Sequence, residues 1–300
     1  MSSEQIAYRG RFAPSPTGPL HFGSLYTAVA SFLQARSVGG KWLVRIDDLD
    51  PLRCKQVYST HILKTLEQFG LTWDETIFYQ STRHLAYKTA LAELKKDNFL
   101  YRCSCSRKEL TERRIPNGIY DQHCLNSAAQ NIQPHALRIK LPVDRLIFND
   151  QIQGDVKQYL KKDVGDFIVF RKDHVAAYHL AVALDDHEQK ITDVLRGYDL
   201  LASTPRQIML QQILGLHTPN YAHIPVISNV EGAKLSKQTF ADDVSLSPVK
   251  QTLISILAYL NLNPIEGLLD GSVSDILSWG IKHWSLNNIK RQPSILFHSN

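Results

Sequence analysis

The sequence has no long hydrophobic run, and its apolar segments are short and interrupted by polar residues. Its first ten residues, MSSEQIAYRG, lack the basic region and apolar core of a signal peptide. We therefore expect no membrane span, no membrane partner and a cytoplasmic location. Internal repeats and low-complexity tracts are also missing, so neither a fibre nor a disordered chain is indicated.

Cysteine is scarce, with four residues among 300. In a cytoplasmic chain these thiols are expected to be reduced. Three of them, Cys103, Cys105 and Cys124, lie in one segment, while Cys54 stands apart. This clustering favours a metal site over a disulfide.

Neither sign of charge dominates the composition. The chain has 34 Lys and Arg against 29 Asp and Glu, a formal net charge of +5 and a pI near 8.9. A mildly basic chain is compatible with a polyanionic partner such as nucleic acid, although many enzymes share this balance. With 43% hydrophobic residues, 300 residues are sufficient for two modest domains with a good core.

The segment RFAPSPTGPLHFGS, residues 11–24, is the most informative part of the chain. Its three prolines and two glycines exclude regular structure, so we expect a shaped loop after the apolar run 6–12. A helix follows, because apolar residues from Leu25 onward recur at spacings of three and four until Gly39 and Gly40 end the pattern. A loop that enters a helix can bind anions, because the first N–H groups of the helix are unpaired.

The residues at this predicted helix start have the chemistry of a phosphate site. His21 can donate a hydrogen bond to a phosphate oxygen, and Gly23 lets a flat ligand approach the backbone closely. Much later, the segment KLSKQ contributes Lys234 and Lys237, two ammonium groups that would neutralise charge developing on a triphosphate. Taken alone, HFGS is also typical of any strand-to-helix turn, and KLSK of a solvated surface loop.

The two segments together resemble the HIGH and KMSKS signatures of class I aminoacyl-tRNA synthetases. RFAPSPTGPLHFGS is similar to the glutamyl-tRNA synthetase branch of that family in particular. RIDDLD at 45–50 and LRGYDLLASTPRQ at 195–207 extend the resemblance, which covers residues 8–240.

This resemblance implies an α/β fold. The expected fold is a doubly wound parallel sheet of the Rossmann-like, class I synthetase type, with an inserted zinc-bearing α+β domain and a small C-terminal helical appendage. The alternation of strands and helices over 6–96 fits such a sheet. We expect the first half of the nucleotide-binding fold at 1–98, the insertion at 99–172, the second half at 173–243 and the appendage at 244–300.

Apolar periodicity predicts several individual elements. Helices are expected at 55–69 and 81–96, and another is opened by Pro205. Residues 221–227 are predicted to form one short strand before the KLSKQ segment.

By the resemblance, the pocket for the amino acid is formed by Arg11, Phe12, Ala13, Pro14, Ser15, Asp47, Tyr178 and Arg196. A glutamate side chain needs a planar, permanently charged fork for two-point binding, which Arg11 and Arg196 can offer. Asp47 would receive the α-amino group. The family more usually has glutamate at this position, so the shorter aspartate implies an adjusted or water-bridged contact.

Plainer interpretations of some of these residues remain open. A lone arginine is usually solvated surface, and Asp47 could belong to a polar turn capped by Pro51. Tyr178 would by default be a core aromatic with a satisfied hydroxyl, while Asp185 and Asp186 could cap a turn.

The residues assigned to ATP by the resemblance are His21, Gly23, Ser24, Lys234, Ser236 and Lys237. His21 and Lys237 would be catalytic, since they stabilise phosphate charge while Mg²⁺ neutralises the triphosphate. The glutamate α-carboxylate would attack the α-phosphorus of ATP and release pyrophosphate. A hydroxyl of the tRNA would then attack the carbonyl of the glutamyl adenylate, with no covalent enzyme intermediate.

The cysteine cluster belongs to YRCSCSRKEL and the later GIYDQHC. Three thiolates make a soft site suited to structural zinc, and a capping box at Ser106 and Glu109 predicts a short helix between the motifs. On spacing alone His123 is the better fourth ligand, because imidazole binds zinc far more often than phenol. The zinc-bearing relatives instead show C-x-C followed by Y-x3-C, which implies the ligand set Cys103, Cys105, Tyr120 and Cys124. Three buried cysteines without a metal are the alternative.

Residues 244–300 allow a few helices but not the long anticodon-binding region of a glutamyl-tRNA synthetase. The chain thus resembles the short paralogues of that catalytic core which place glutamate on queuosine in the anticodon loop of tRNA(Asp). The implied activity is an ATP-dependent ligase acting on L-glutamate and on tRNA(Asp) carrying queuosine, and we expect a monomer. Two alternatives remain: a compact synthetase charging the 3′ end of tRNA(Glu), and a catalytically silent paralogue that binds nucleotide or RNA.

Overall fold

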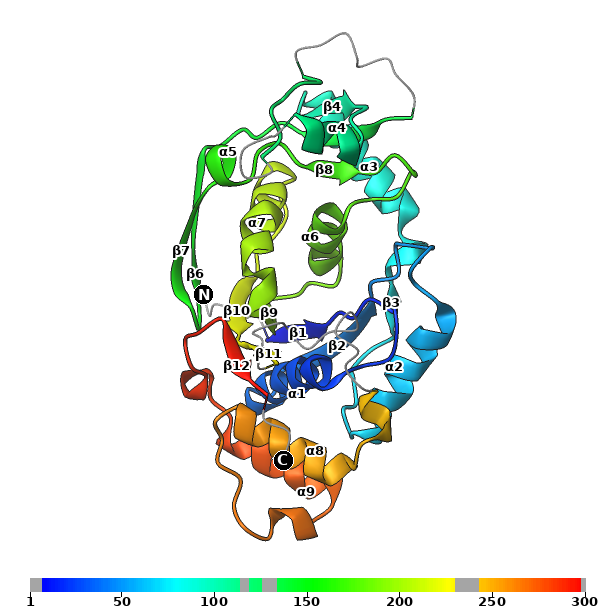
Figure 1. Cartoon of the computed structure of the whole chain (residues 1–300). Helices are drawn as coiled ribbons and strands as arrows, with labels where there is room; N and C mark the ends of the chain where they lie inside the picture. Colours follow the sequence, from blue (N-terminus) through cyan, green and yellow to red (C-terminus); the bar gives the residue numbers. More distant parts are fainter. Residues whose placement is uncertain (1–6, 114–118, 126–133, 230–242, 298–300) are drawn as a thin grey trace, which may run out of the picture.

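The computed structural model describes residues 7–113, 119–125, 134–229 and 243–297. The chain first forms one half of a layered α/β unit and then leaves it at α3 (Figure 1). The elements of this half are β1 (Arg9–Phe12), α1 (Phe22–Ser37), β2 (Lys41–Ile46), α2 (Gln56–Gln68), β3 (Phe78–Tyr79) and α3 (His84–Lys96). The helices predicted at 55–69 and 81–96 are thereby confirmed, with slightly shorter bounds.

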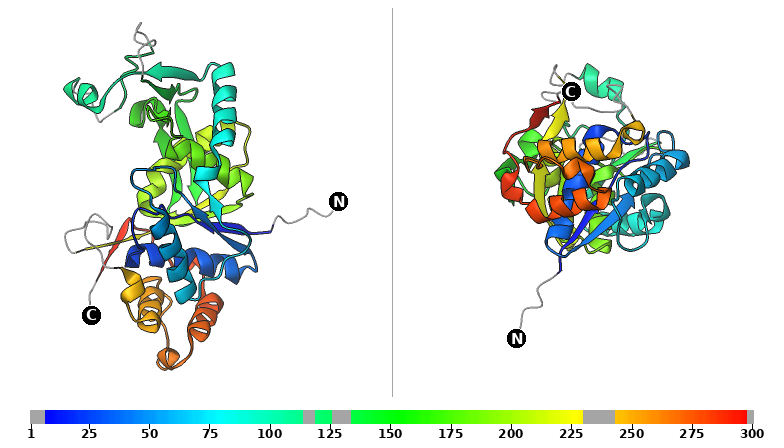
Figure 2. Two further views of the ribbon diagram at one scale, coloured as in Figure 1. Left: turned by 90° about the vertical axis from the view of Figure 1, so that its right-hand side faces the viewer. Right: turned by 90° about the horizontal axis from the view of Figure 1, so that it is seen from below.

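A second group of elements extends from one end of the molecule, as Figure 2 shows in its left view. It consists of β4 (Leu100–Cys103), α4 (Arg107–Glu112), β5 (Ala136–Ile139), β6 (Arg145–Asp150), β7 (Gly154–Tyr159), α5 (Leu160–Asp163) and β8 (Ile168–Phe170). β4, β5 and β8 form a small antiparallel sheet, and β6 and β7 form a hairpin. The predicted capping box of Ser106 and Glu109 opens α4.

The chain then returns to the central sheet and ends in a helical pair. The returning elements are α6 (Tyr178–Glu188), β9 (Asp193–Gly197), α7 (Thr204–Ile213), β10 (Asn220–Ile224) and β11 (Val226–Ser228). The last elements are α8 (Val249–Tyr259), α9 (Val273–His283) and β12 (Ser294–Leu296), and the two helices lie at the end opposite the second group (Figures 1 and 2). Within the described residues no helix is both long enough and apolar enough to cross a lipid bilayer.

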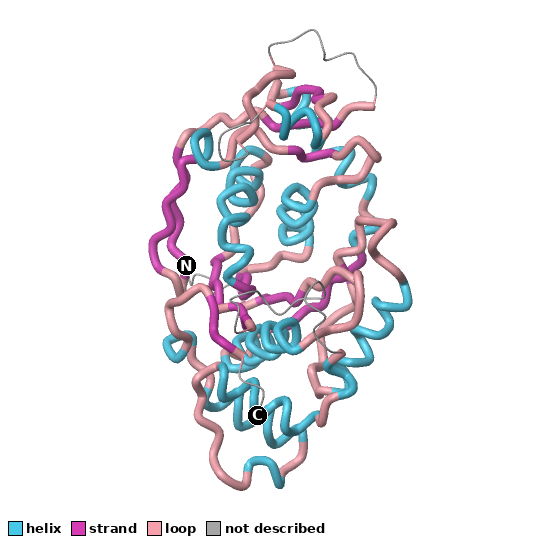
Figure 3. Tube along the Cα trace, viewed as in Figure 1, coloured by secondary structure: helices cyan, strands magenta, loops and turns pink. Residues whose placement is uncertain are grey.

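The central sheet is parallel and doubly wound. β1 pairs with β2, β2 with β3, and β9 with β10, all in parallel. The amide of Thr192, just before β9, donates to the carbonyl of Arg9 at 3.0 Å, so β1 and β9 lie side by side. The resulting order is β3-β2-β1-β9-β10, and β6 continues it as a parallel neighbour of β10, with β7 beyond β6. α1 lies on one face of the β3-β2-β1-β9-β10 part and α6 and α7 on the other (Figure 3), which confirms the predicted Rossmann-like fold.

This strand order determines where a ligand can bind. The order reverses between β1 and β9, and a crevice forms at the carboxyl ends of the strands on either side of such a switch point. Arg11 lies on β1 and Arg196 on β9. Two residues 185 positions apart are therefore expected at the same crevice.

α1 is buried between the central sheet and the C-terminal helices. It begins at Phe22, three residues before the apolar face that starts at Leu25, because His21 caps it. Its inner face packs on the sheet and its outer face on α9, where a Cβ added to Gly280 would lie 3.2 Å from Leu33. Glycine at this position lets the C-terminal helices approach the core closely.

The expectation of one strand over 221–227 is wrong. Two strands occur instead, β10 ending at Ile224 and β11 beginning at Val226. Pro225 separates them, since proline has no N–H to continue the hydrogen-bonded ladder. β11 then pairs with the C-terminal strand β12 rather than with β9.

Candidate active site

A cavity of about 180 Å³ lies at the switch point between β1 and β9. Among its lining residues are all of the sequence-predicted glutamate and ATP residues that the structure describes: Arg11, Phe12, Ala13, Pro14, Ser15, His21, Gly23, Ser24, Asp47, Tyr178 and Arg196. Lys234, Ser236 and Lys237 lie outside the described residues, so their role stays a prediction. Val226 and Ile227 of β11, the strand that precedes that segment, also line the cavity.

His21 occupies the N-cap of α1. Its Nδ1 accepts a hydrogen bond from the amide of Ser24 at 3.3 Å, and its Nε2 lies 2.9 Å from the Ser24 hydroxyl. The ring is 7% exposed and is therefore held at the positive end of the helix dipole. A phosphate at this end of the cavity would meet the ring and the first turn of α1 together.

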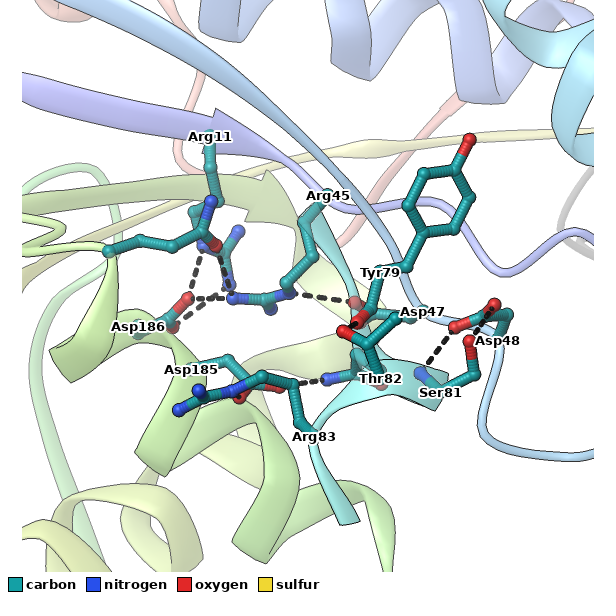
Figure 4. Close-up of polar contacts among 12 residues, drawn as sticks. Arg11, Arg45, Asp47, Asp48, Tyr79, Ser81, Thr82, Arg83, Asp185 and Asp186 are labelled. Atoms are coloured by element: carbon teal, nitrogen blue, oxygen red, sulfur yellow. Dashed lines mark hydrogen bonds and ion pairs between the residues drawn. The ribbon is translucent and has the colours of Figure 1, made fainter. Parts of the chain in front are cut away.

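Two arginines and two aspartates form a buried ionic network beneath the cavity (Figure 4). Arg11 donates Nε and Nη2 to the two carboxylate oxygens of Asp186, at 3.0 and 3.2 Å. Arg45 bridges the aspartates, with Nη1 2.6 Å from Asp186 and Nε 2.7 Å from Asp47. All four residues are less than 7% exposed, so their charges are compensated by one another rather than by water.

The network occupies one edge of the Arg11 guanidinium. The two-point fork that was predicted to bind a glutamate side chain is already directed at Asp186. Asp186 is not a surface turn cap: burial would raise its pKa, but the charges of Arg11 and Arg45 outweigh burial and lower the pKa to about 2. That edge of the Arg11 guanidinium is occupied by Asp186, and a role of Arg11 in binding glutamate stays a prediction.

Asp47 is the carboxylate of the network that reaches the cavity. Burial raises its pKa to about 6, although the charge and hydrogen bond of Arg45 oppose this rise. An incoming ammonium group would favour the ionised form, because it supplies a second positive charge.

Arg196 presents a different arrangement. It is 4% exposed and donates Nε to His223 at 3.0 Å, and Nη2 to Thr204 at 2.7 Å and Gln207 at 2.8 Å. Nη1 is buried and has no hydrogen-bond partner within the described part of the chain. A buried unpaired guanidinium nitrogen is costly, and a ligand carboxylate in the adjoining cavity would satisfy it.

Tyr178 is not the core aromatic that its surroundings in the sequence suggested. It is the first residue of α6, and 37% of its surface is exposed. Its place on the cavity wall agrees with the role that the resemblance implied.

The three clustered cysteines meet at one point of the second group of elements. The sulfur atoms of Cys103, Cys105 and Cys124 all lie within 4.8 Å of one another. The hydroxyl of Tyr120 lies 3.5 Å from the sulfurs of Cys103 and Cys105, whereas His123 is exposed. The geometry thus places the phenol, and not the imidazole, beside the thiols.

These four groups fit a tetrahedral metal ion. Zinc with Zn–S bonds of about 2.3 Å and a Zn–O bond of about 2.0 Å places sulfur and oxygen ligands about 3.5 Å apart. Two arginines flank the cluster: Arg138 donates Nε to Cys103 at 3.2 Å, and Arg113 donates Nη2 to Cys105 at 3.4 Å. They would offset the negative charge that several anionic ligands leave around a divalent ion.

Sequence patterns did not reveal the residues that hold the cavity side chains in place from behind. Arg45 could have been suspected, because an arginine inside the apolar run KWLVRI must find a buried partner. Asp186, Asp150 and His223 gave no such signal, since their partners are far away in the sequence.

The family model "tRNA synthetases class I (E and Q), catalytic domain" matches residues 7–262. A protein of Methylococcus capsulatus named "Glutamyl-Q tRNA(Asp) synthetase" is 47% identical over 286 residues, 94% of this chain and 93% of its own length. A protein of the same name from Dechloromonas aromatica is 46% identical over 294 residues, 96% of this chain and 98% of its own length.

Two solved structures of glutamate-tRNA ligases have a similar fold at lower sequence identity. The glutamate-tRNA synthetase of Elizabethkingia anophelis superposes with a TM-score of 0.80 at 26% identity, over 98% of this chain and 68% of its own. A glutamate tRNA ligase of Elizabethkingia meningosepticum, in complex with its amino acid, gives a TM-score of 0.79 at 26% identity, over 97% and 67%. With the family model matched from residue 7 to residue 262, the chain belongs to the class I tRNA synthetases of the glutamyl and glutaminyl (E and Q) group.

Proposed function

We propose that the chain is an ATP-dependent ligase that activates L-glutamate as glutamyl adenylate and transfers it to queuosine in tRNA(Asp). The observation that carries this proposal is the similarity to proteins named for that activity, at 46–47% identity over more than nine-tenths of both lengths. The cavity supports it, because its charged groups are complementary to an amino acid with an acidic side chain.

Glutamate binds with its side-chain carboxylate toward Arg196, whose Nη1 is unpaired in the described structure. Its ammonium group pairs with Asp47, which Arg45 holds from below. Ser15 and Tyr178 add directional contacts from the cavity wall. This orientation leaves the α-carboxylate free to face the helix start at His21.

ATP binds with its phosphates against the first turn of α1. The α-carboxylate attacks the α-phosphorus in line, the bond to the bridging oxygen breaks, and pyrophosphate leaves with its electron pair. His21 stabilises the charge on the phosphates from the N-cap position, with Lys237 as its predicted counterpart beyond the described residues. Mg²⁺ bound to ATP neutralises part of the triphosphate charge.

The second step transfers the activated acyl group. A hydroxyl of the tRNA attacks the carbonyl of the adenylate and forms an ester, and AMP leaves. Positioning and electrostatics suffice for this step, so the chain requires no nucleophilic side chain.

Zinc would be held by Cys103, Cys105, Tyr120 and Cys124. When bound, it supplies structural cross-linking and no chemistry, because the cluster belongs to a different group of elements from the cavity. Its function is to stabilise β4, α4 and the segment that carries Tyr120.

The second candidate is a compact synthetase that charges the 3′ end of tRNA(Glu). It is favoured by the two structural neighbours, which are glutamate-tRNA ligases that superpose with TM-scores of about 0.8. To separate the two, the protein is incubated with ATP, radiolabelled glutamate and tRNA(Asp) that either carries or lacks queuosine. Nuclease fragments of the tRNA then locate the label.

Label in the anticodon fragment that depends on queuosine is the expected result. Label on the 3′-terminal adenosine of tRNA(Glu) would instead support the compact synthetase. Glutamate-dependent pyrophosphate exchange without tRNA is the preliminary assay, and its absence would favour a catalytically silent paralogue.

A further inference from the structure

Arg196 is the cavity end of a buried chain of polar side chains. His223 on β10 is its register partner across the strand pair, and Asp150 at the end of β6 lies beyond His223. His223 is 0% exposed and Asp150 is 1% exposed, and neither is among the residues that line the cavity. Their side chains can therefore act on a ligand through Arg196, either directly or by way of Thr204, whose hydroxyl lies 3.1 Å from Nε2 of His223 and 2.7 Å from Nη2 of Arg196.

The hydrogen bonds assign one tautomer to His223. Its Nε2 lies 3.0 Å from Nε of Arg196, which can only donate, and 3.1 Å from the Thr204 hydroxyl, which can donate or accept. The contact with Arg196 requires Nε2 to be unprotonated. Its Nδ1 lies 2.5 Å from Oδ2 of Asp150, so the ring proton is on Nδ1 and is donated to the carboxylate. Burial lowers the pKa of His223 to about 4, although the hydrogen bond that the ring donates to Asp150 opposes this fall, so the ring is neutral at pH 7.

Asp150 is itself fixed by the backbone. Its Oδ1 accepts from the amides of Gln153 at 2.8 Å, Ile152 at 3.0 Å and His223 at 3.2 Å. These bonds leave Oδ2 directed at the imidazole and hold the carboxylate in its ionised form.

We propose that Asp150 and His223 are positioning residues that orient Arg196 for the substrate carboxylate, Asp150 by fixing the histidine tautomer and His223 by accepting Nε–H. With Nε and Nη2 both held, Nη1 is the guanidinium nitrogen left for a ligand. This inference rests on the proposed glutamate binding by Arg196. It adds two residues that determine how the arginine is presented and hence the preference for an acidic side chain.

The variant Asp150→Asn tests the tautomer directly. The asparagine oxygen can still accept the backbone amides, but its NH₂ group donates to Nδ1 and forces the ring proton onto Nε2. Two donors, Nε2–H and Nε–H of Arg196, then face each other, and the guanidinium must turn away. In pyrophosphate exchange, KM for glutamate should rise about ten- to hundredfold while KM for ATP stays constant.

Asp155→Asn on the neighbouring strand β7 is the matched control. It makes the same substitution at an exposed position, where the side chain accepts only from Asn149. It should leave both KM values unchanged. Melting temperatures of both variants separate a folding defect from a binding defect.

A second pair of variants keeps the inference testable if Asp150→Asn does not fold. His223→Gln can still place an oxygen near the position of Nε2 and should retain more glutamate affinity than His223→Leu, which has no acceptor. In the unsubstituted protein, ¹⁵N chemical shifts of labelled histidine, assigned with His223→Gln, should show the Nδ1–H tautomer.

An Nε2–H tautomer would overturn the inference, as would Asp150→Asn with an unchanged KM for glutamate. Equal rises in the KM values for glutamate and ATP would also overturn it, because they indicate general distortion. If the unsubstituted protein lacks glutamate-dependent exchange, the proposed function fails instead, and the tautomer measurement still decides the geometry.

Discussion

The cavity and the cysteine cluster compensate buried charge in two different ways. The cluster takes its four side chains from residues 103–124, a short piece of chain. The cavity network takes its charges from Arg11 on β1, Arg45 on β2, Asp47 just after β2 and Asp186 on α6. The cluster is thus a local motif whose geometry fits a cation, whereas the charged network of the cavity is assembled by the tertiary fold.

This difference decides what each region depends on. Removing one charge from the cavity network leaves a partner buried and unpaired, which destabilises the fold itself. Removing one ligand from the cluster weakens a metal site and the elements beside it, and leaves the sheet intact.

The largest effect is expected for Arg45→Met, which removes a cation that is 0% exposed and is shared by Asp47 and Asp186. Breaking a buried ion pair in this way costs about 3–5 kcal/mol. The free energy of unfolding, measured by urea denaturation at pH 7, should fall by that amount. Arg53→Met is the control, since the Arg53 side chain is 71% exposed and its pair with Asp50 contributes about 1 kcal/mol or less. Similar decreases in the free energy of unfolding of the two variants would show that the buried network does not stabilise the fold more than a surface ion pair does.

Cys105→Ser should abolish stoichiometric metal binding with little effect on the central sheet. Elemental analysis of protein purified without chelator should find one zinc per chain before the substitution and much less after it. Limited proteolysis should then cut first in the second group of elements. Cys54→Ser is the matched control, because Cys54 lies outside the cluster and should keep the metal. Unchanged zinc in Cys105→Ser would remove the ligand assignment.

Asp47 should make glutamate binding in the cavity depend on pH. Because its pKa is raised to about 6, Asp47 is protonated and neutral below that pH and ionised above it. The ionised form binds the ammonium group, so KM for glutamate in pyrophosphate exchange should fall as the pH rises from 5 to 7. In Asp47→Asn this change should disappear, and KM at pH 7 should be about ten- to hundredfold higher. If KM for glutamate changed with pH in the same way in Asp47→Asn and in the unsubstituted protein, a group other than Asp47 would cause the pH dependence.

Sequence alone could predict the local part of this molecule. Apolar spacing gave α2 and α3 nearly to their ends, and the capping box gave α4, because those signals come from neighbouring residues. The cavity residues were found through motifs that resemble a family, not through their contacts. Arg45 and Asp186 are 141 positions apart, and no spacing rule connects such a pair.

The smallest expected effect concerns the two arginines beside the thiols. Arg138 is 6% exposed, and its guanidinium lies 3.6 Å from the Tyr120 ring centre, whereas the Arg113 side chain is 26% exposed and also pairs with Asp121. Groups that contact metal ligands typically change metal affinity by about 10–100-fold. We expect Arg138→Met to lie at the lower end of that range and Arg113→Met below it, because water screens the more exposed charge. Competition with a chromogenic chelator measures both affinities. If Arg113→Met lowered metal affinity as much as Arg138→Met or more, the burial of an arginine would not determine how strongly it stabilises the metal site. The cluster would then differ from the cavity network, where burial determines the cost of losing a charge.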